Sequence, residues 1–480
     1  MDEGLIKKFI PFALGNIITL ILSVVTVPIV TRILSPEQYG KAAMFTLATS
    51  IICTIILMGC EQSFVRFFYE EKVRSRTKLL YECIKIPIVV SCIASIGIVI
   101  LRRNISMVLF NEYSLKSIIF VIVQSIFMAL NTFALLVIRM QQKGKTYSIL
   151  LVINKITNFI LIIFLVNILT NDYKIIIIAA VVSNLFVTIC AIVFEFKFWN
   201  FKDSKNMELK NTTSNIVKFA IPLVFTFMIN WFFQSIDKMS IKHWVNYEEL
   251  GMYTSAFTLV GLLNVVQSAF TTFWTPVAFE RYEKDSKDIK FFEKINKIIS
   301  YIMLLVAILL ILFKDIIILI LGSKYKSAAF VMPFLVFMPV MYTISETTQI
   351  GINFSKKSNC HIVVAVVSLI VDIIGMYLLV PILGARGAAI STGIAYISFF
   401  TMRTFLSLKF YKVNYNLKKF YTITALIVVY AFYATFNSIN LIYILIGIVE
   451  LVMLSMFYKD VVKELFSMIL VLRKKRIKKI

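Results

Sequence analysis

Apolar residues gather into long blocks along the chain, and short polar stretches separate the blocks. The stretch TRILSPEQYG, residues 31–40, lies between two such blocks, and so does KHWVNYEELG, residues 242–251. An α-helix rises 1.5 Å per residue, so a block of about 20 apolar residues crosses the hydrocarbon core of a bilayer. The pattern therefore predicts an all-α polytopic membrane protein.

We expect about 14 transmembrane helices, because that many apolar blocks approach the length needed to cross a bilayer. The alternation of blocks and polar connections places both ends of the chain on the same side of the membrane. The candidate spans are residues 9–31, 41–64, 80–101, 114–139, 147–169, 174–196, 216–241, 250–275, 297–313, 327–354, 359–381, 387–408, 420–436 and 440–458.

The two polar stretches belong to a longer repeat with an offset of 211 positions. Six spans separate the copies, so both copies enter the membrane in the same direction. The repeat predicts two parallel six-helix bundles, residues 1–205 and 206–410, followed by two additional helices in residues 411–460 and a basic amphipathic tail in residues 461–480. The repeated residues are Lys7, Ile10, Pro11, Ile18, Glu37 and Gly40, which recur as Lys218, Ile221, Pro222, Ile229, Glu248 and Gly251.

The turn inside TRILSPEQYG has a local cause. Ser35 can accept a hydrogen bond from the first turn of the following helix, and Pro36 fits the first helical position. Glu37 adds a negative charge where the helix dipole favours it. These residues predict that the second helix begins at Ser35–Pro36.

Composition agrees with a membrane protein: 59% of the 480 residues are hydrophobic, 16% are charged, and the mean hydropathy is +0.87. The net charge of +24 does not indicate nucleic-acid binding, because the basic residues lie in short loops between apolar blocks. Most of them lie in alternate connections, which predicts cytoplasmic N- and C-termini. Six cysteines without a CxxC pair favour neither a disulfide framework nor a structural metal site.

Four motifs carry a resemblance to a known family. PIVTRILSPEQYGKAAMF, residues 28–45, is similar to a first loop with a hydroxyl-Pro-Glu-x-Tyr-Gly core, and GCEQSFVRFFYEE, residues 59–71, resembles the end of the second helix. QSIDKMSIKHWVNYEELGMYTSAF, residues 234–257, and LGARGAAISTGIAY, residues 383–396, extend the likeness into the second half. The chain resembles the polysaccharide-exporting branch of the multidrug/oligosaccharidyl-lipid/polysaccharide exporter superfamily.

This resemblance implies two six-helix bundles that face each other across a central cavity. It also implies a flippase of the bacterial inner membrane. The substrate would be an undecaprenyl-diphosphate-linked oligosaccharide, moved from the inner to the outer leaflet by alternating access for surface polysaccharide synthesis. We expect a monomer that is not an enzyme and that works with a polysaccharide polymerase and glycosyltransferases.

Charged residues inside membrane spans are costly and usually face a cavity. Lys85 and Lys155 lie inside predicted spans, and Arg66 and Arg139 lie at the predicted cytoplasmic ends of two others. Because arginine and lysine bind phosphate oxygens, we expect these four residues to form a cationic mouth that binds the diphosphate. The alternative is that the long side chains extend to the lipid phosphates at the membrane surface.

Three oxygen-bearing residues are candidates for cation coupling. Asp237 and Asp372 lie inside predicted spans, and Thr392 lies in the twelfth. Such ligands suit a hard cation such as Na⁺, and the resemblance implies a cation site in the seventh, eleventh and twelfth spans. H⁺ coupling or an ion pair with a lysine across the bundle are the alternatives. No other cofactor is expected.

The tenth predicted span contains the polar strip SETTQIGINFS. Glu346, Gln349 and Asn353 recur at three- and four-residue spacing, which places them on one helix face that we expect to line the cavity or the contact between bundles. Pro333 and Pro339 precede the strip and predict a kink in this helix.

Two other functions remain open. A cation-coupled multidrug exporter of the same superfamily would need acidic residues in the cavity of the N-terminal bundle, where Glu61 is the one candidate. A membrane sugar polymerase or ligase usually needs a large external loop bearing arginine or histidine. Every predicted external loop is short, and His243 and His361 are the only histidines.

Overall fold

The computed structural model describes residues 3–169, 172–202, 207–357, 359–464 and 467. Every regular element in these residues is a helix, which confirms the predicted fold class. The chain forms two compact units, Met1–Lys238 and Met239–Ile480. Most of the predicted basic tail, residues 468–480, lies outside the described residues.

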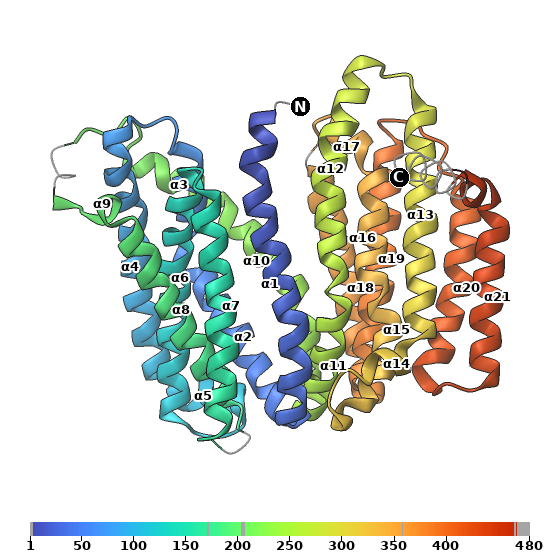
Figure 1. The fold of residues 1–480 in the computed structure, drawn as a ribbon, viewed down its shortest axis with the longest axis horizontal. Coiled ribbons are helices and arrows are strands. Elements are labelled where there is room, and N and C mark those ends of the chain that lie inside the picture. The colour runs from blue at the N-terminus through green and yellow to red at the C-terminus, as the bar shows by residue number, and fades with distance from the viewer. Residues whose placement is uncertain (1–2, 170–171, 203–206, 358, 465–466, 468–480) are drawn as a thin grey trace, which may run out of the picture. The chain divides into compact units, whose positions relative to one another are not determined.

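Unit 1 is built from long helices that run side by side (Figure 1). Helix α8 packs on α6 and α7, α2 packs on α6, and α1 packs on α7. The helices are α1 (Glu3–Ile33), α2 (Pro36–Leu57), α3 (Cys60–Phe67), α4 (Arg76–Ile100), α5 (Arg102–Phe110), α6 (Leu115–Met140), α7 (Gly144–Val166), α8 (Lys174–Phe194), α9 (Phe196–Trp199) and the greater part of α10 (Thr213–Trp244).

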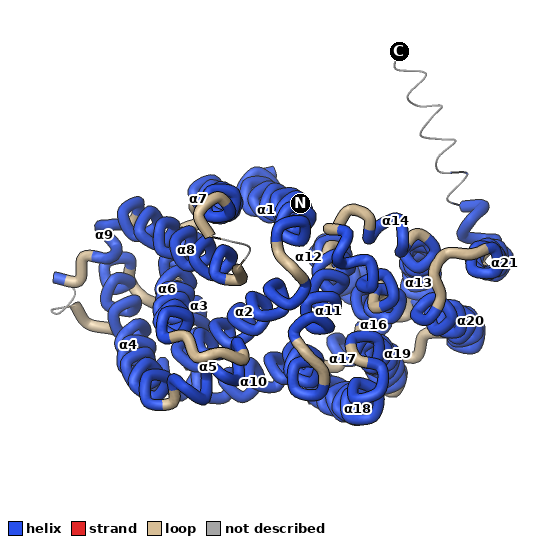
Figure 2. Tube along the Cα trace, turned by 90° about the horizontal axis from the view of Figure 1, so that it is seen from below, coloured by secondary structure: helices blue, strands red, loops and turns tan. Residues whose placement is uncertain are grey.

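Unit 2 is also made of helices, and Figure 2 shows the two additional ones, α20 and α21, beside α13. Helix α19 packs on α16 and α18, and the additional helices α20 and α21 pack on α13. The helices are α11 (Tyr247–Val260), α12 (Leu263–Lys284), α13 (Ile289–Leu312), α14 (Lys314–Ile318), α15 (Met332–Leu335), α16 (Phe337–Thr348), α17 (Ile350–Phe354), α18 (Asn359–Leu383), α19 (Ala385–Leu408), α20 (Leu417–Phe436) and α21 (Leu441–Phe457).

Every predicted span overlaps at least one helix, although α19, in the twelfth predicted span, is not among the helices apolar enough to count as a membrane span. Among the described residues, nine helices are long and apolar enough to cross a membrane, and the bent pair Ser323–Phe330 and Met332–Thr348 raises the number to ten. Shorter apolar helices account for further predicted spans at Ile17–Ile33, Thr213–Val224 and Leu441–Phe457. The tenth span bends by 57° just before Pro333, as its prolines predict.

The sequence repeat corresponds to a structural repeat. Helices α2 and α11 begin at Pro36 and Tyr247, and α8 and α19 begin at Lys174 and Ala385, so both pairs keep the offset of 211 positions. The starts are capped alike. Ser35 Oγ accepts a hydrogen bond from the N–H of Gln38, as predicted, and Asn246 Oδ1 accepts one from the N–H of Glu249.

The third residue of each repeated helix also makes an equivalent long-range contact. In unit 1, Gln38 Oε1 accepts a hydrogen bond at 3.0 Å from the N–H of Tyr173, directly before α8. In unit 2, Glu249 Oε2 accepts one at 2.9 Å from the N–H of Ala385, the first residue of α19. The start of α2 is therefore hydrogen-bonded to the start of α8, and the start of α11 is hydrogen-bonded in the same way to the start of α19.

Unit 1 has an apolar core that holds the start of α10. Cys60, Phe64 and Phe133 pack with Ile216 and Ala220. The hydroxyl of Ser63 donates to the carbonyl of Ile216 at 2.9 Å. Gly59 has φ +72, and a Cβ there would lie 2.8 Å from the carbonyl oxygen of Ala220. Glycine is therefore required where α2 gives way to α3.

Unit 2 has a buried charged network between α16 and α19. Arg403 is 6% exposed, and its guanidinium pairs with Glu346 at 2.9 Å and donates to Ser345 Oγ at 2.6 Å. It also donates to Gln349 Oε1 and lies about equally far, 5.3 and 5.2 Å, from the ring centroids of Tyr342 and Phe399. A buried charge needs such partners, because its desolvation is otherwise uncompensated.

We expect Arg403→Met to destabilise unit 2 by about 3 to 5 kcal/mol, because it leaves the carboxylate of Glu346 buried without its cation. Thermal unfolding in detergent micelles would measure the change. The double variant Arg403→Met, Glu346→Met removes both charges and should recover much of the lost stability. A double variant that unfolds as easily as Arg403→Met would show that the ion pair is not the cause.

Candidate functional site

The strongest candidate site is a polar cavity inside unit 1, which we call the amide cavity. Its volume is about 380 Å³, and it lies among α2, α6, α7 and α8. Three of its lining residues have apolar side chains, and the others bear amides, hydroxyls or an ammonium group. The lining consists of Phe45, Thr46, Thr49, Gln124, Met128, Asn131, Thr132, Asn154, Lys155, Asn158, Ala180, Ser183 and Asn184.

The amide side chains lie in the middle of helices that cross the membrane. Asn131 Nδ2 donates to Asn184 Oδ1 at 2.9 Å, which links α6 to α8. Gln124 is 7% exposed, and its side-chain oxygen has no hydrogen-bond partner. A polar group at hydrocarbon depth is costly unless it is paired or faces water. The amide cavity therefore indicates a water-filled space that can accept hydrogen bonds from, and donate them to, a ligand.

Lys155 gives the amide cavity its positive charge. It lies near the middle of α7, between Asn154 and Asn158. Within the described part of the chain, no carboxylate oxygen lies within 4.0 Å of its amine. An unpaired cation in such a position is a candidate to bind an anionic group.

A second space in unit 1, which we call the aromatic cavity, adjoins the amide cavity at Thr132. Its volume is about 430 Å³. The lining consists of Ser50, Thr54, Leu57, Glu61, Gln62, Thr132, Phe227 and Trp231. Glu61 is its acidic residue, so an acid lines this cavity and a base lines the adjoining one.

The other three predicted phosphate-binding residues lie outside both cavities. Arg66 is exposed and pairs with Glu70 at 2.5 Å, one helical turn away. Lys85 is exposed and pairs with Glu82 at 2.8 Å. Arg139 is also exposed, near the end of α6. Of the four, the structure places Lys155 alone in a described cavity.

The predicted cation-coupling residues are distributed over both units. In unit 2, Asp372 is 2% exposed, and its Oδ1 accepts from Ser391 Oγ at 2.9 Å. The hydroxyl of Thr392, the next residue, donates to the carbonyl of Ala388 at 3.0 Å and lies 3.2 Å from the hydroxyl of Tyr253. Asp237 belongs to unit 1, where its Oδ1 accepts from the N–H of Lys238.

The predicted polar strip of the tenth span divides between two environments. Glu346 and Gln349 are buried in the network around Arg403, at 3% and 7% exposure. Asn353 Oδ1 lies 3.0 Å from His361 Nε2, at the start of α18. These contacts join α16 to α19 and α17 to α18 in unit 2.

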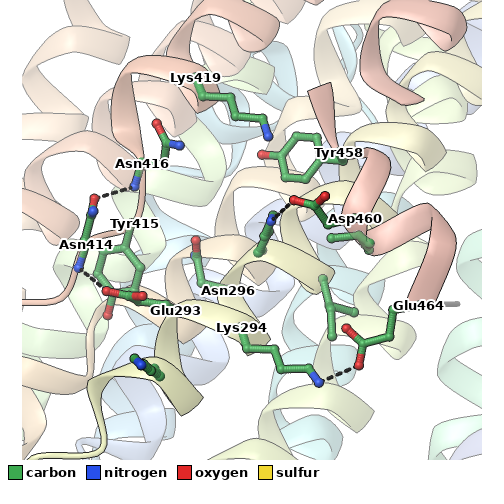
Figure 3. A pocket seen from close by; sticks show the side chains of 14 residues that line it. Glu293, Lys294, Asn296, Asn414, Tyr415, Asn416, Lys419, Tyr458, Asp460 and Glu464 are labelled. Carbon is green, nitrogen blue, oxygen red and sulfur yellow. Dashed lines mark hydrogen bonds and ion pairs between the residues drawn. The ribbon is translucent and has the colours of Figure 1, made fainter. Parts of the chain in front are cut away.

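A pocket of about 360 Å³ in unit 2 lies between α13, the connection that precedes α20, and the end of α21 (Figure 3). Its charges are largely neutralised. Lys297 pairs with Asp460 at 2.9 Å, and Lys294 pairs with Glu464. Lys419 lies 4.6 Å from the centre of the Tyr458 ring. Because two of its four lysines are paired with carboxylates and it lies outside the helices that cross the membrane beside Lys155, we rank this pocket below the amide cavity as a site for an anionic substrate.

Sequence reasoning missed the amide residues, although a signal was present. Asn154 and Asn158 are four residues apart on α7, and Gln124 and Asn131 are seven apart on α6. Both spacings place the pair on one helix face. A search for amides at helical spacing within apolar spans would have identified this face next to Lys155.

Comparisons with known proteins agree with this architecture. A search of curated proteins finds no match for the sequence. The fold is similar to that of "Lipid II flippase MurJ, inward closed conformation", with a TM-score of 0.68, 18% identity, and coverage of 94% of this chain and 100% of that one. It is also similar to an inward-facing multidrug resistance MATE family transporter of the MOP superfamily, with a TM-score of 0.57, 14% identity, and coverage of 81% and 94%.

The sequence itself matches a protein family over more than half of its length. Residues 5–282, which include α1 to α8, α10 and the residues of both cavities of unit 1, match the family described as polysaccharide biosynthesis protein. The chain therefore belongs to the polysaccharide biosynthesis protein family, as a multi-pass membrane protein with a flippase-like fold.

Proposed function

We propose that this protein is a flippase for an undecaprenyl-diphosphate-linked oligosaccharide, which it moves from the inner to the outer leaflet of the bacterial inner membrane. The observation that carries the proposal is the unpaired ammonium of Lys155 among amide side chains in the middle of the membrane. Family membership and the fold shared with a lipid II flippase support the same class of substrate.

The chemistry of the amide cavity matches both parts of such a headgroup. Lysine binds phosphate oxygens through charge-assisted hydrogen bonds. Asn131, Asn154, Asn158 and Asn184 offer amide donors and acceptors, which suit sugar hydroxyls. The cavity shelters the polar headgroup, while the polyprenyl chain remains in the lipid.

Translocation then follows from alternating access of the cavity to the two sides of the membrane. With cytoplasmic termini, the inside-negative potential favours outward movement of an anionic headgroup by about 2.3 kcal/mol per charge per 100 mV. The chain's own residues bind and release the headgroup and break no covalent bond, so the protein acts as a transporter.

We assign the return step to coupling with a cation at α18 and α19. Asp372 supplies a carboxylate, and Ser391 and Thr392 supply hydroxyls, which are ligands suited to Na⁺. The described residues contain no group of three or more His, Cys, Asp or Glu side chains that could hold a metal ion. A single buried carboxyl supplies too few ligands and too little charge to bind a divalent ion tightly. It is better suited to a weakly bound Na⁺ or to a proton.

Glu61 favours a second candidate function, that of a cation-coupled multidrug exporter. It is a buried acid on a cavity of the N-terminal bundle, as that function requires. Efflux of ethidium from cells that express the protein would support this function. Movement of a fluorescent lipid-linked oligosaccharide in vesicles would support the flippase.

We expect Lys155→Met to lower the rate of lipid-linked oligosaccharide flipping at least about tenfold, because it removes the charge that binds phosphate. Lys155→Arg keeps that charge and should retain much of the activity. The rate would be measured in reconstituted vesicles with a fluorescent substrate.

Lys85→Met is the matched control, because both lysines are exposed and Lys85 is already paired with Glu82. Its rate should change less than about twofold, which is the range of a surface ion pair. Equal losses in Lys155→Met and Lys85→Met would argue against the amide cavity as the phosphate site and for a wider cationic mouth.

We expect flipping to depend on a Na⁺ or pH gradient and Asp372→Asn to abolish that dependence, because the neutral amide cannot exchange a cation or a proton. Rates would be compared in vesicles with matched Na⁺ and K⁺ buffers at two pH values. Thr401→Ala, which removes a hydroxyl elsewhere on α19, serves as the control. Wild-type flipping rates that do not change with either the Na⁺ gradient or the pH gradient would rule out coupling at this site.

A further inference from the structure

The aromatic cavity carries two buried polar atoms of opposite hydrogen-bonding character. Glu61 is 7% exposed, and its Oε2 has no hydrogen-bond partner. Trp231 lines the same cavity, and its indole Nε1–H also has none. A carboxylate oxygen accepts hydrogen bonds and an indole N–H donates them. Each costs free energy while it stays buried and unpaired.

This combination selects among ligand chemistries. An ammonium group donates hydrogen bonds and could satisfy Glu61 but not Trp231. A phosphate accepts them and could satisfy Trp231, but the carboxylate of Glu61 would repel it. A hydroxyl both donates and accepts, so a molecule with several hydroxyls can satisfy both residues after small rotations of their side chains.

The rest of the lining suits a sugar ring. Trp231 and Phe227 present aromatic faces, against which the C–H groups of a sugar can pack. Gln62, Ser50 and Thr54 add groups that can bond to hydroxyls. The volume of about 430 Å³ is within the range of small-molecule sites. None of the described lining residues is a lysine or an arginine, so this lining offers a phosphate no cation.

We propose that the aromatic cavity is a subsite for an uncharged sugar, bound by Glu61 and Trp231. This inference rests on the proposed function, in which Lys155 of the adjoining amide cavity binds the phosphate of the same substrate. Thr132 lines both cavities, so one ligand can extend from one to the other. The opposite charges then orient the headgroup, with its phosphate toward Lys155 and its sugar toward Glu61.

The test compares two probes: undecaprenyl diphosphate that carries a single N-acetylglucosamine, and bare undecaprenyl diphosphate. Binding to the full-length protein in nanodiscs is followed by tryptophan fluorescence. The sugar-bearing probe should change the emission of the wild type more than the bare probe does, and Trp231→Phe should remove that difference. Glu61→Gln should weaken binding of the sugar-bearing probe about tenfold, the effect of losing one hydrogen bond to a charged group.

The controls separate the subsite from the phosphate site. Glu280→Gln makes the same chemical change at an exposed glutamate paired with Lys284 and should leave both affinities unchanged. Lys155→Met should weaken both probes, whereas Glu61→Gln should leave the affinity for the bare probe within about twofold.

Equal binding of the two probes, or equal effects of Glu61→Gln on both, would overturn the sugar subsite and leave the phosphate site standing. Failure of both probes to bind would overturn the proposed function together with the subsite. Competition by ethidium that depends on Glu61 would assign the aromatic cavity to organic cations instead. Size-exclusion profiles of Glu61→Gln and Trp231→Phe show whether each variant is folded, and either variant alone is enough for the test.

Discussion

The hydrocarbon core of the bilayer accepts a polar side chain only when that side chain is paired or faces water, and the buried groups of this protein meet the constraint in both ways. In unit 2, Arg403 pairs with Glu346 and Asp372 accepts a hydrogen bond from the hydroxyl of Ser391, although Glu450 keeps one side-chain oxygen without a partner. Unit 1 leaves Lys155 and Glu61 on cavities. Paired groups stabilise a fold, whereas unpaired groups on a cavity remain available to a ligand.

The repeat strengthens this contrast, because it compares two copies of one scaffold in register. Thr46 and Thr49 of α2 line the amide cavity, and the offset of 211 positions places Phe257 and Val260 at the same points of α11. Asn184 of α8 corresponds in the same way to Ala395 of α19. The second copy folds with apolar residues at these positions, so the scaffold does not need the polar ones. Their presence in the first copy is better explained by binding.

The architecture could be predicted because it depends on local and periodic signals. The apolar blocks and the caps at Ser35 and Asn246 each depend on a few neighbouring residues. The repeat is visible because the same short motifs recur after 211 positions. The partners of individual charges could not be predicted. Glu346 was placed on a polar helix face, but Arg403, which lies on a different helix, decides its environment. The pairing of Lys85 is different, because Glu82 lies three residues before it and the sequence already contained the signal that separates Lys85 from Lys155.

The separation of charge between the two cavities also bears on how a flippase could release its substrate. If a single cavity held both the phosphate and the sugar around one cation, the affinity for phosphate would dominate and would vary little with the glycan. In the arrangement that we propose, opposite charges in adjoining cavities would divide recognition: the sugar would contribute to orientation, and Glu61 would oppose deeper entry of the phosphate. A phosphate that Lys155 attracts and Glu61 repels would be held at an intermediate depth. Such a ligand can leave when the cavity opens to the other side of the membrane.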